Sequence, residues 1–285
     1  PNPKPQTPNP KPLQTPRRPA RAERLNNTEM LDGIPQLERR NQALVEAGER
    51  LARGNFQEGN VLGSGSFAKV RRVTSLSTGR AYAMKVLSLK QIRQLKLTEQ
   101  LRNELTILAT CQHESIITLY GAFAEEEQVF LLMELAEGSL FDKMVREFPL
   151  SEERVASFMG DIVRAVVYLH SLSPPILHRD LKPENVLVIK GRCKIADFGW
   201  SNTDNAYRNT YCGTFDYLAP EMILGTGHNE KLDVWTLGVL MFELLEGRPP
   251  FGPREKIADK RLASKITEKN ILRGLLEFGR KLSPE

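Results

Sequence analysis

Three side chains suited to handling a proton and an anionic group follow one another in residues 178–185, which read HRDLKPEN. Asp180 is a candidate to accept a proton from a hydroxyl group, and Lys182 is a positive point charge for an anionic group. Asn185 and, after a predicted short strand and turn, Asp197 offer the hard oxygen ligands that Mg²⁺ prefers. These residue types suit chemistry that depends on positioning and charge neutralisation more than on a covalent intermediate.

A glycine-rich segment lies far upstream of these residues. Residues 63–70 read GSGSFAKV, in which Gly63, Ser64 and Gly65 would let backbone N–H groups approach phosphates. Ala68 stands where such loops usually have a third glycine, and alanine is tolerated there if its φ is negative. Taken alone, the segment is a common glycine-rich turn.

Lys85 lies in an apolar, strand-like run, AYAMKV, at residues 81–86. It is either a strand lysine whose amine reaches solvent or a buried amine that needs an anionic partner. Glu104, in a predicted helix over residues 98–110, could supply that partner and direct Lys85 at two phosphates of a nucleotide.

The order of these motifs, followed by the APE triplet at 219–221, resembles the signature of protein kinases across residues 56–285. The resemblance implies ATP and Mg²⁺ as cofactors, with Asn185 and Asp197 as the metal ligands. It implies that Asp180 accepts the proton of the substrate hydroxyl while Lys182 lies against the γ-phosphate. Lys182 and the GT pair at 213–214 resemble the Ser/Thr class rather than the Tyr class.

The adenine side of the nucleotide site also follows from this resemblance. The MELA run at 133–136 resembles the hinge, where Met133 lines the pocket and backbone groups of Glu134 and Ala136 bind the adenine edge. The remaining nucleotide-binding positions that the resemblance implies are Leu62, Val70, Ala83, Glu184 and Leu187.

Two further segments are similar to those of one kinase family in particular. Residues 195–201 read IADFGWS and residues 210–217 read TYCGTFDY, and both resemble the Aurora kinases. That resemblance implies activation by phosphorylation of Thr210, with Arg179 pairing with the phosphate. It implies that Glu184 holds an arginine of a basic protein substrate. A targeting or activating protein partner, and a place at the spindle, centrosome or cilium, follow by analogy alone.

Other functions remain open at this point. A Polo-like or calcium/calmodulin-type kinase fits the same motifs, and so does a pseudokinase that serves as a scaffold. A pseudokinase would be expected to lack one or more of the catalytic residues, but Lys85, Asp180, Asn185 and Asp197 are all present. A metabolic nucleotide-binding enzyme would need a helix directly after the glycine-rich segment, whereas residues 69–73 continue as a predicted strand.

The predicted fold class is α+β, with two lobes. Strands are expected near residues 60–62, 69–73, 81–86 and 129–134, which gives a small β-rich N-lobe over 56–133. A hinge at 134–138 leads to a larger helical C-lobe over 139–285, with helices near 151–172 and 231–245. The resemblance implies later helices carrying an arginine that pairs with Glu221, so the C-lobe is expected to lack its last helices here.

The residues before the kinase-like part divide in two. Residues 1–35 are rich in proline near their start and are expected to be a disordered tail. Residues 36–55 are expected to form an amphipathic helical extension, because Leu37, Leu44 and Leu51 are seven apart. This helix would pack on the domain or bind a partner.

Charge and composition exclude some classes of function. The formal net charge is +5, but residues 1–55 carry ten Lys/Arg against six Asp/Glu, and residues 56–285 carry 30 against 29. The domain itself therefore gives no sign of nucleic-acid binding. Three cysteines without framework spacing indicate free thiols in a reducing compartment, and no apolar run is long enough to span a bilayer. A cytoplasmic or nuclear protein is expected.

Overall fold

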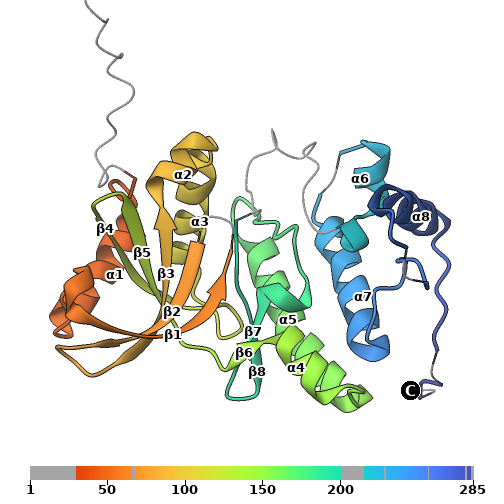
Figure 1. The fold of residues 1–285 in the computed structure, drawn as a ribbon, viewed down its shortest axis with the longest axis horizontal. Coiled ribbons are helices and arrows are strands. Elements are labelled where there is room, and N and C mark those ends of the chain that lie inside the picture. The colour runs from red at the N-terminus through yellow and green to blue at the C-terminus, as the bar shows by residue number, and fades with distance from the viewer. Residues whose placement is uncertain are drawn as a thin grey trace, which may run out of the picture.

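The computed structural model describes residues 30–65, 68–199, 215–227, 229–255, 257–279 and 281–283. Two lobes lie side by side, a β-rich one containing the earlier residues and a mainly helical one containing the later residues (Figure 1). The α+β, two-lobed prediction is therefore confirmed. No helix in the described ranges is long and apolar enough to cross a bilayer.

The N-lobe is built on one antiparallel sheet of five strands in the order β1-β2-β3-β5-β4. Helix α3 packs against this sheet from the side of the C-lobe, through a core that it shares with Leu87 and Leu131. Strand β4 is an edge of the sheet, so one row of its backbone groups has no neighbouring strand. The elements are β1 (Phe56–Ser64), β2 (Ala68–Ser75), β3 (Ala81–Ser88), α2 (Leu89–Gln94), α3 (Thr98–Thr110), β4 (Leu119–Glu125) and β5 (Gln128–Met133).

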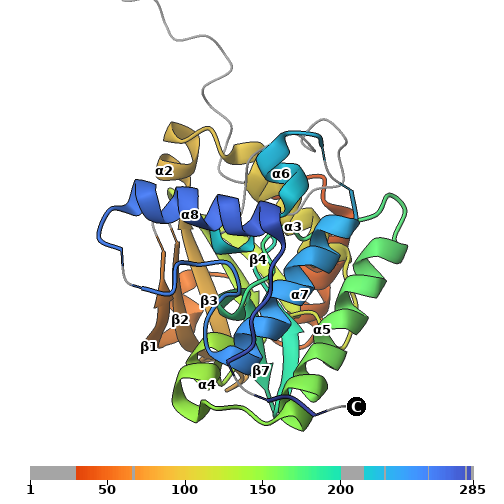
Figure 2. The same ribbon diagram turned by 90° about the vertical axis from the view of Figure 1, so that its right-hand side faces the viewer.

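The C-lobe packs helices around α5 and α7, which lie against each other (Figure 2). A small sheet, β6-β7-β8, faces the N-lobe and carries the loops of the site. Helices begin where the sequence caps them: the Ser139 and Ser151 hydroxyls accept backbone N–H groups at the starts of α4 and α5. The elements are β6 (Gly138–Ser139), α4 (Leu140–Glu147), α5 (Glu152–Ser171), β7 (Val186–Ile189), β8 (Arg192–Ile195), α6 (Pro220–Leu224), α7 (Lys231–Glu246) and α8 (Lys260–Arg273).

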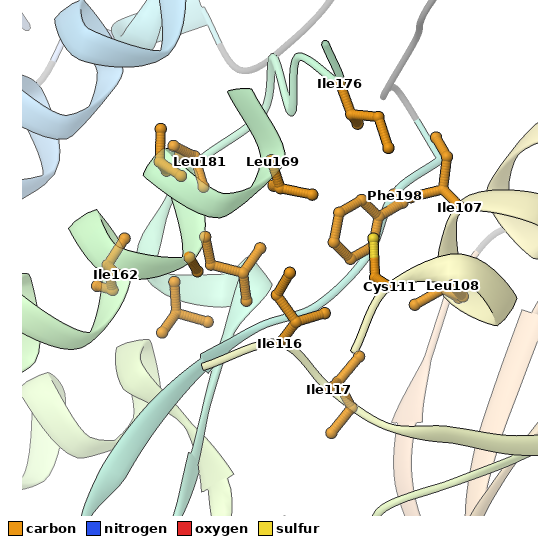
Figure 3. Packing of buried hydrophobic residues seen from close by; sticks show 14 of the residues in the cluster. Ile107, Leu108, Cys111, Ile116, Ile117, Ile162, Leu169, Ile176, Leu181 and Phe198 are labelled. Carbon is orange, nitrogen blue, oxygen red and sulfur yellow. The ribbon is translucent and has the colours of Figure 1, made fainter. Parts of the chain in front are cut away.

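One continuous apolar core contains residues of both lobes. Phe198 is completely buried in it, and Ile107 and Cys111 from the end of α3 lie beside its ring (Figure 3). Leu169 and Ile176 approach from the C-lobe. The position of α3 and the position of Phe198 are consequently tied together by packing.

The residues before β1 are part of the folded domain. Helix α1 (Pro35–Glu46) lies against β4 and α3, with Leu37 and Leu44 buried. It ends sooner than the periodicity predicted, because the chain turns at Gly48, whose φ is +89°. The expected disordered tail needs correction at its end, since Met30 and Ile34 are buried; residues 1–29 lie outside the described part of the chain.

Glu49 fixes the segment that follows α1. Its carboxylate is 2% exposed and accepts hydrogen bonds from the hydroxyls of Ser75, Thr78 and Tyr82 at 2.6, 2.5 and 2.7 Å. Burial opposes the charge, but these donors prevail and lower the pKa of Glu49. The chain between α1 and β1 is thus bonded to the β2–β3 hairpin.

A groove of about 1190 Å³ runs along α7 in the C-lobe. Its walls are mostly apolar and include Trp235, Phe242, Phe251 and Phe278. Glu221 of the APE triplet lies in this lining.

Candidate active site

The register of the N-lobe sheet assembles the nucleotide side of the site. Val70 of β2 pairs with Gly63 of β1 on one side and with Lys85 of β3 on the other. Ala83, two residues before Lys85 and so on the same face of β3, pairs with Met133 of β5. Five residues predicted separately from the sequence therefore lie on neighbouring positions of one sheet.

Lys85 has the anionic partner that its sequence context required. Its Nζ lies 2.6 Å from Oε1 of Glu104, and both side chains are largely buried, at 16% and 7% exposure. Burial alone would lower the pKa of Lys85, yet the carboxylates of Glu104 and Asp197 raise it above its usual value. The amine is therefore held in its charged form, with the carboxylates of Glu104 and Asp197 near it.

The catalytic-loop candidates form one hydrogen-bonded unit. Asp180 is 5% exposed, and its Oδ2 lies 2.9 Å from Nζ of Lys182. The side-chain amide of Asn185 donates to both the backbone oxygen and Oδ2 of Asp180, each at 2.8 Å. This fixes the orientation of the Asp180 carboxylate, and it directs the Asn185 Oδ1 atom away from that carboxylate.

A buried carboxylate of α7 accepts hydrogen bonds from the backbone of this loop. Asp233 is 0% exposed, and its two oxygens accept the backbone N–H groups of His178 and Arg179 at 2.9 and 2.8 Å. The ring of His170 bonds the same carboxylate at 2.7 Å. Arg179 has a φ of +68°, a costly conformation for a residue with a side chain, and these bonds help to impose it. The sequence prediction missed Asp233, although an acid among the apolar residues of a predicted helix was a signal for it.

The DFG triplet, residues 197–199, connects the C-lobe to α3. The amide of Ala196 donates to the backbone oxygen of Asn185 at 2.8 Å, which brings Asp197 beside the catalytic loop. Asp197 has a φ of +60°, and its Oδ1 accepts the Gly199 N–H at 3.3 Å. The side chain of Gln100 in α3 donates to the backbone oxygen of Gly199. Because the DFG triplet is attached to α3 in this way, Asp197 is held near Lys85.

The predicted hinge differs in one detail from expectation. The Glu134 N–H donates to the backbone oxygen of Thr118 at 2.9 Å, so only the carbonyl of Glu134 is left to bind an adenine edge. Its carboxylate pairs with Lys194 at 2.8 Å. Leu62 at the end of β1 is 48% exposed, and Leu187 lies on β7, directly after the catalytic loop.

Some predicted residues cannot be placed. Ser66 and Phe67 at the tip of the glycine-rich segment, and residues 200–214 with Thr210, lie outside the described ranges. Ala68, in place of a third glycine, is not one of the described residues with a positive φ, so it meets the condition under which alanine is tolerated.

The donor set fits a magnesium ion. Asp197 and Asn185 contribute hard oxygens next to the loop that holds Asp180. Within the described residues there is no cluster of three or more His, Cys, Asp or Glu side chains able to enclose a metal. Such a sparse set suits Mg²⁺, which typically takes one or two protein carboxylates and completes its shell with phosphates and water.

Three carboxylates of the C-lobe, those of Glu184, Asp216 and Glu243, lie close enough to affect one another's charge. Burial raises the pKa of Glu243 on α7, and the charges of Glu184 and Asp216 add to this effect. Burial likewise raises the pKa of Asp216. The sequence prediction included only Glu184; Glu243 could have been found as another acid in an apolar helix.

Comparison with known proteins assigns the chain to a family. Residues 56–281 match the family described as "Protein kinase domain". The chain is 41% identical over 201 residues to an Aurora kinase of Schizosaccharomyces pombe, a match that covers 70% of this chain and 56% of that protein. It is 39% identical over 217 residues to the serine/threonine-protein kinase Aurora-2 of Arabidopsis thaliana, covering 75% and 76%. For Aurora kinase B of Mus musculus the values are 40% over 200 residues, covering 69% and 57%.

The chain thus spans 56% to 76% of the length of these relatives. The family match includes the Lys85–Glu104 pair, the Asp180 loop and Asp197. This protein belongs to the protein kinase family, and within that family it resembles the Aurora kinases.

Proposed function

We propose that the protein transfers the γ-phosphate of ATP to serine and threonine hydroxyls of other proteins. The arrangement of Asp180, Lys182 and Asn185 carries this proposal, because one hydrogen-bonded unit presents a proton acceptor, a cation and an oxygen ligand together. The Lys85–Glu104 ion pair of the N-lobe supports it as well.

Each side chain has a separate task. Asp180 orients the attacking hydroxyl and accepts its proton, and its bond from Asn185 keeps the carboxylate in place. Lys182 neutralises charge on the phosphoryl group, and Lys85 holds two phosphates of the nucleotide. A Mg²⁺ ion bound by Asn185 and Asp197 would supply charge neutralisation to those phosphates.

We propose a preference for substrates with an arginine near the phosphorylated residue. The three neighbouring carboxylates Glu184, Asp216 and Glu243 support it, because closely spaced acids are stabilised by a guanidinium placed among them. Burial and the charges of Glu184 and Asp216 raise the pKa of Glu243, and a guanidinium placed among these acids would offset that effect.

We also propose that phosphorylation of Thr210 activates the enzyme. Arg179 is the residue on the catalytic loop to which the phosphate would bind, and its backbone is bonded to Asp233 beside Asp180. A phosphate bound there would be coupled to the loop that positions the proton acceptor. By the same resemblance we propose a cytoplasmic or nuclear location at the spindle, centrosome or cilium, together with a targeting partner.

The decisive experiment measures transfer of labelled phosphate from ATP to a Ser/Thr peptide that contains arginine. Asp180→Asn is the matched control, because it keeps the volume and the hydrogen-bonding shape of the side chain. Transfer that the control abolishes, with a lower KM than for the same peptide carrying glutamine in place of arginine, supports the proposal. Mass spectrometry of the incubated protein tests for phosphate on Thr210. An ATP-binding, folded protein without transfer would instead indicate a scaffold.

A further inference from the structure

The residues ahead of β1 contact the helix that carries Glu104. Residues 30–46, here called the N-terminal brace, place Met30, Ile34 and Leu37 in the core at 8%, 2% and 1% exposure. The same core contains Leu101 and Leu105 of α3. α3 therefore has the nucleotide site on one side and the brace on another.

Arg40 fastens the end of α3 to the start of β4. Its guanidinium donates to the backbone oxygens of Ala109, Cys111 and Leu119 at 2.8, 3.0 and 2.6 Å. The last carbonyls of a helix have no partner within the helix, and a cation at that end also complements the helix dipole. A planar fork of donors can serve three such carbonyls at once, which a lysine amine on a flexible stem does less well.

Asn41, the next residue, docks the brace on the edge of the sheet. Its side chain accepts the Ala122 N–H at 2.9 Å and donates to the Ala122 oxygen at 2.7 Å, as a neighbouring strand would. The approach is close enough that a Cβ on Gly121 would lie 2.5 Å from Oδ1 of Asn41. The contact is specific to these residues rather than a loose apolar one.

A second set of bonds secures the other end of the brace. Arg102 of α3 donates to the backbone oxygens of Met30 and Asp32 at 3.2 and 2.9 Å. Leu37, Arg40, Asn41 and Leu44 share one face of α1, since they are spaced three and four apart. The brace thus grips α3 near its start and at its end.

Helix α3, which the brace contacts, also positions the catalytic groups. Glu104 pairs with Lys85 at 2.6 Å, and Gln100 bonds Gly199 of the DFG triplet. Cys111, whose carbonyl Arg40 holds, lies beside the ring of Phe198 (Figure 3). A shift of the end of α3 would therefore disturb the ion pair and the DFG triplet together.

We propose that Arg40 is a positioning residue for phosphoryl transfer, acting through α3 on the Lys85–Glu104 pair and on Phe198. This rests on the proposed kinase activity. The brace supplies within the chain a constraint on α3 that the catalytic domain needs in order to present Lys85 to the nucleotide.

The test compares Arg40→Ala and Arg40→Lys with Arg39→Ala in the full chain. Arg39 is exposed on the same helix, so its removal changes the helix charge equally without touching α3. Arg40→Ala is expected to lower kcat by at least about 10-fold, equivalent to about 1.4 kcal/mol. The kcat of Arg40→Lys should lie between those of Arg40→Ala and the unmodified chain. The kcat of Arg39→Ala should equal that of the unmodified chain. The KM for the peptide should not change, because the carboxylates proposed to bind it lie on the C-lobe.

A double-mutant cycle separates positioning from general loss of stability. If Arg40 acts through Glu104, Arg40→Ala should reduce kcat by less than about twofold in a Glu104→Gln background, because coupled residues are not additive. The proposal would be overturned if the two substitutions lowered kcat by independent factors that multiply in the double variant. It would also be overturned if Arg40→Ala left kcat unchanged. If Arg40→Ala does not fold, the same cycle with Arg40→Lys decides. An unmodified chain without transfer refutes the kinase activity, whereas an active chain indifferent to Arg40 refutes only the role of the brace.

Discussion

Replacing Asp233 by asparagine tests whether the buried acid of α7 holds the catalytic loop. The substitution keeps the size of the side chain but exchanges one acceptor oxygen for an NH₂ donor. All three partners of Asp233 approach as donors when His170 carries its proton on Nε2: the N–H groups of His178 and Arg179 and the His170 ring. Whichever way the amide turns, it faces at least one buried N–H group with another donor.

The magnitude follows from those bonds. A buried N–H left without an acceptor costs about 1–3 kcal/mol, and a hydrogen bond to a charged group contributes about 1.5–3 kcal/mol. We therefore expect Asp233→Asn to lower the free energy of unfolding by about 3 kcal/mol, which corresponds to roughly 6–12 °C in the melting midpoint of a domain of this size. Because Arg179 loses part of what imposes its φ of +68°, kcat should fall as well.

The assay is a pair of thermal melts with kcat measured well below either midpoint. Asp32→Asn is the matched control, since it makes the same chemical change at an exposed aspartate. A midpoint for Asp233→Asn within about 2 °C of the control, less than the shift expected for 1 kcal/mol, would refute the reasoning. An unchanged kcat would show that the loop geometry does not depend on this carboxylate.

Three further outcomes are expected. Glu243→Gln should melt higher than the unmodified chain at pH 7, because burial raises the pKa of Glu243 and its charge opposes folding; the difference should vanish below about pH 4, where both states bind the proton. The same variant should raise the KM of an arginine-containing peptide. Glu49→Gln should melt lower at pH 7, because the lowered pKa of Glu49 contributes stability above about pH 4.3; melts at falling pH should show this contribution lost as Glu49 is protonated. Gly121→Ala should cost about 1–3 kcal/mol in a denaturant titration, because its Cβ would overlap Asn41 and Leu44; an equal midpoint would mean that α1 moves aside freely.

Local sequence patterns were sufficient to predict helices and strands with one apolar face, and to predict site residues that lie in a contiguous motif. The predicted helix over 98–110 coincides with α3 (Thr98–Thr110), and the candidates in the contiguous 178–185 motif are hydrogen-bonded to one another. Strand β4 was not predicted, because its LYGAFAE run has a glycine and no strict alternation; its pairing with β5 decides its conformation.

The residues that sequence reasoning missed act across long separations. Asp233 reaches the catalytic loop from 54 and 55 positions away, and Arg40 reaches α3 and β4 from 69 to 79 positions away. Each is a polar residue whose partners across that separation are backbone groups, and backbone groups carry no side-chain identity that a sequence pattern could match. Leucine spacing predicted the helix of the brace, but the two polar side chains on the same face provide its specific contacts.

The beginning of the family match and the beginning of the folded unit do not coincide. The family match begins at residue 56, whereas among the residues that the structure describes the buried side chains already begin at Met30. A recombinant protein cut at the family boundary would lose the bonds of Asn41 to the edge strand β4 and would bare apolar side chains of α3, against which α1 packs. Exposed strand edges and apolar patches promote aggregation, so solubility during purification should improve when the expressed chain starts ahead of residue 30.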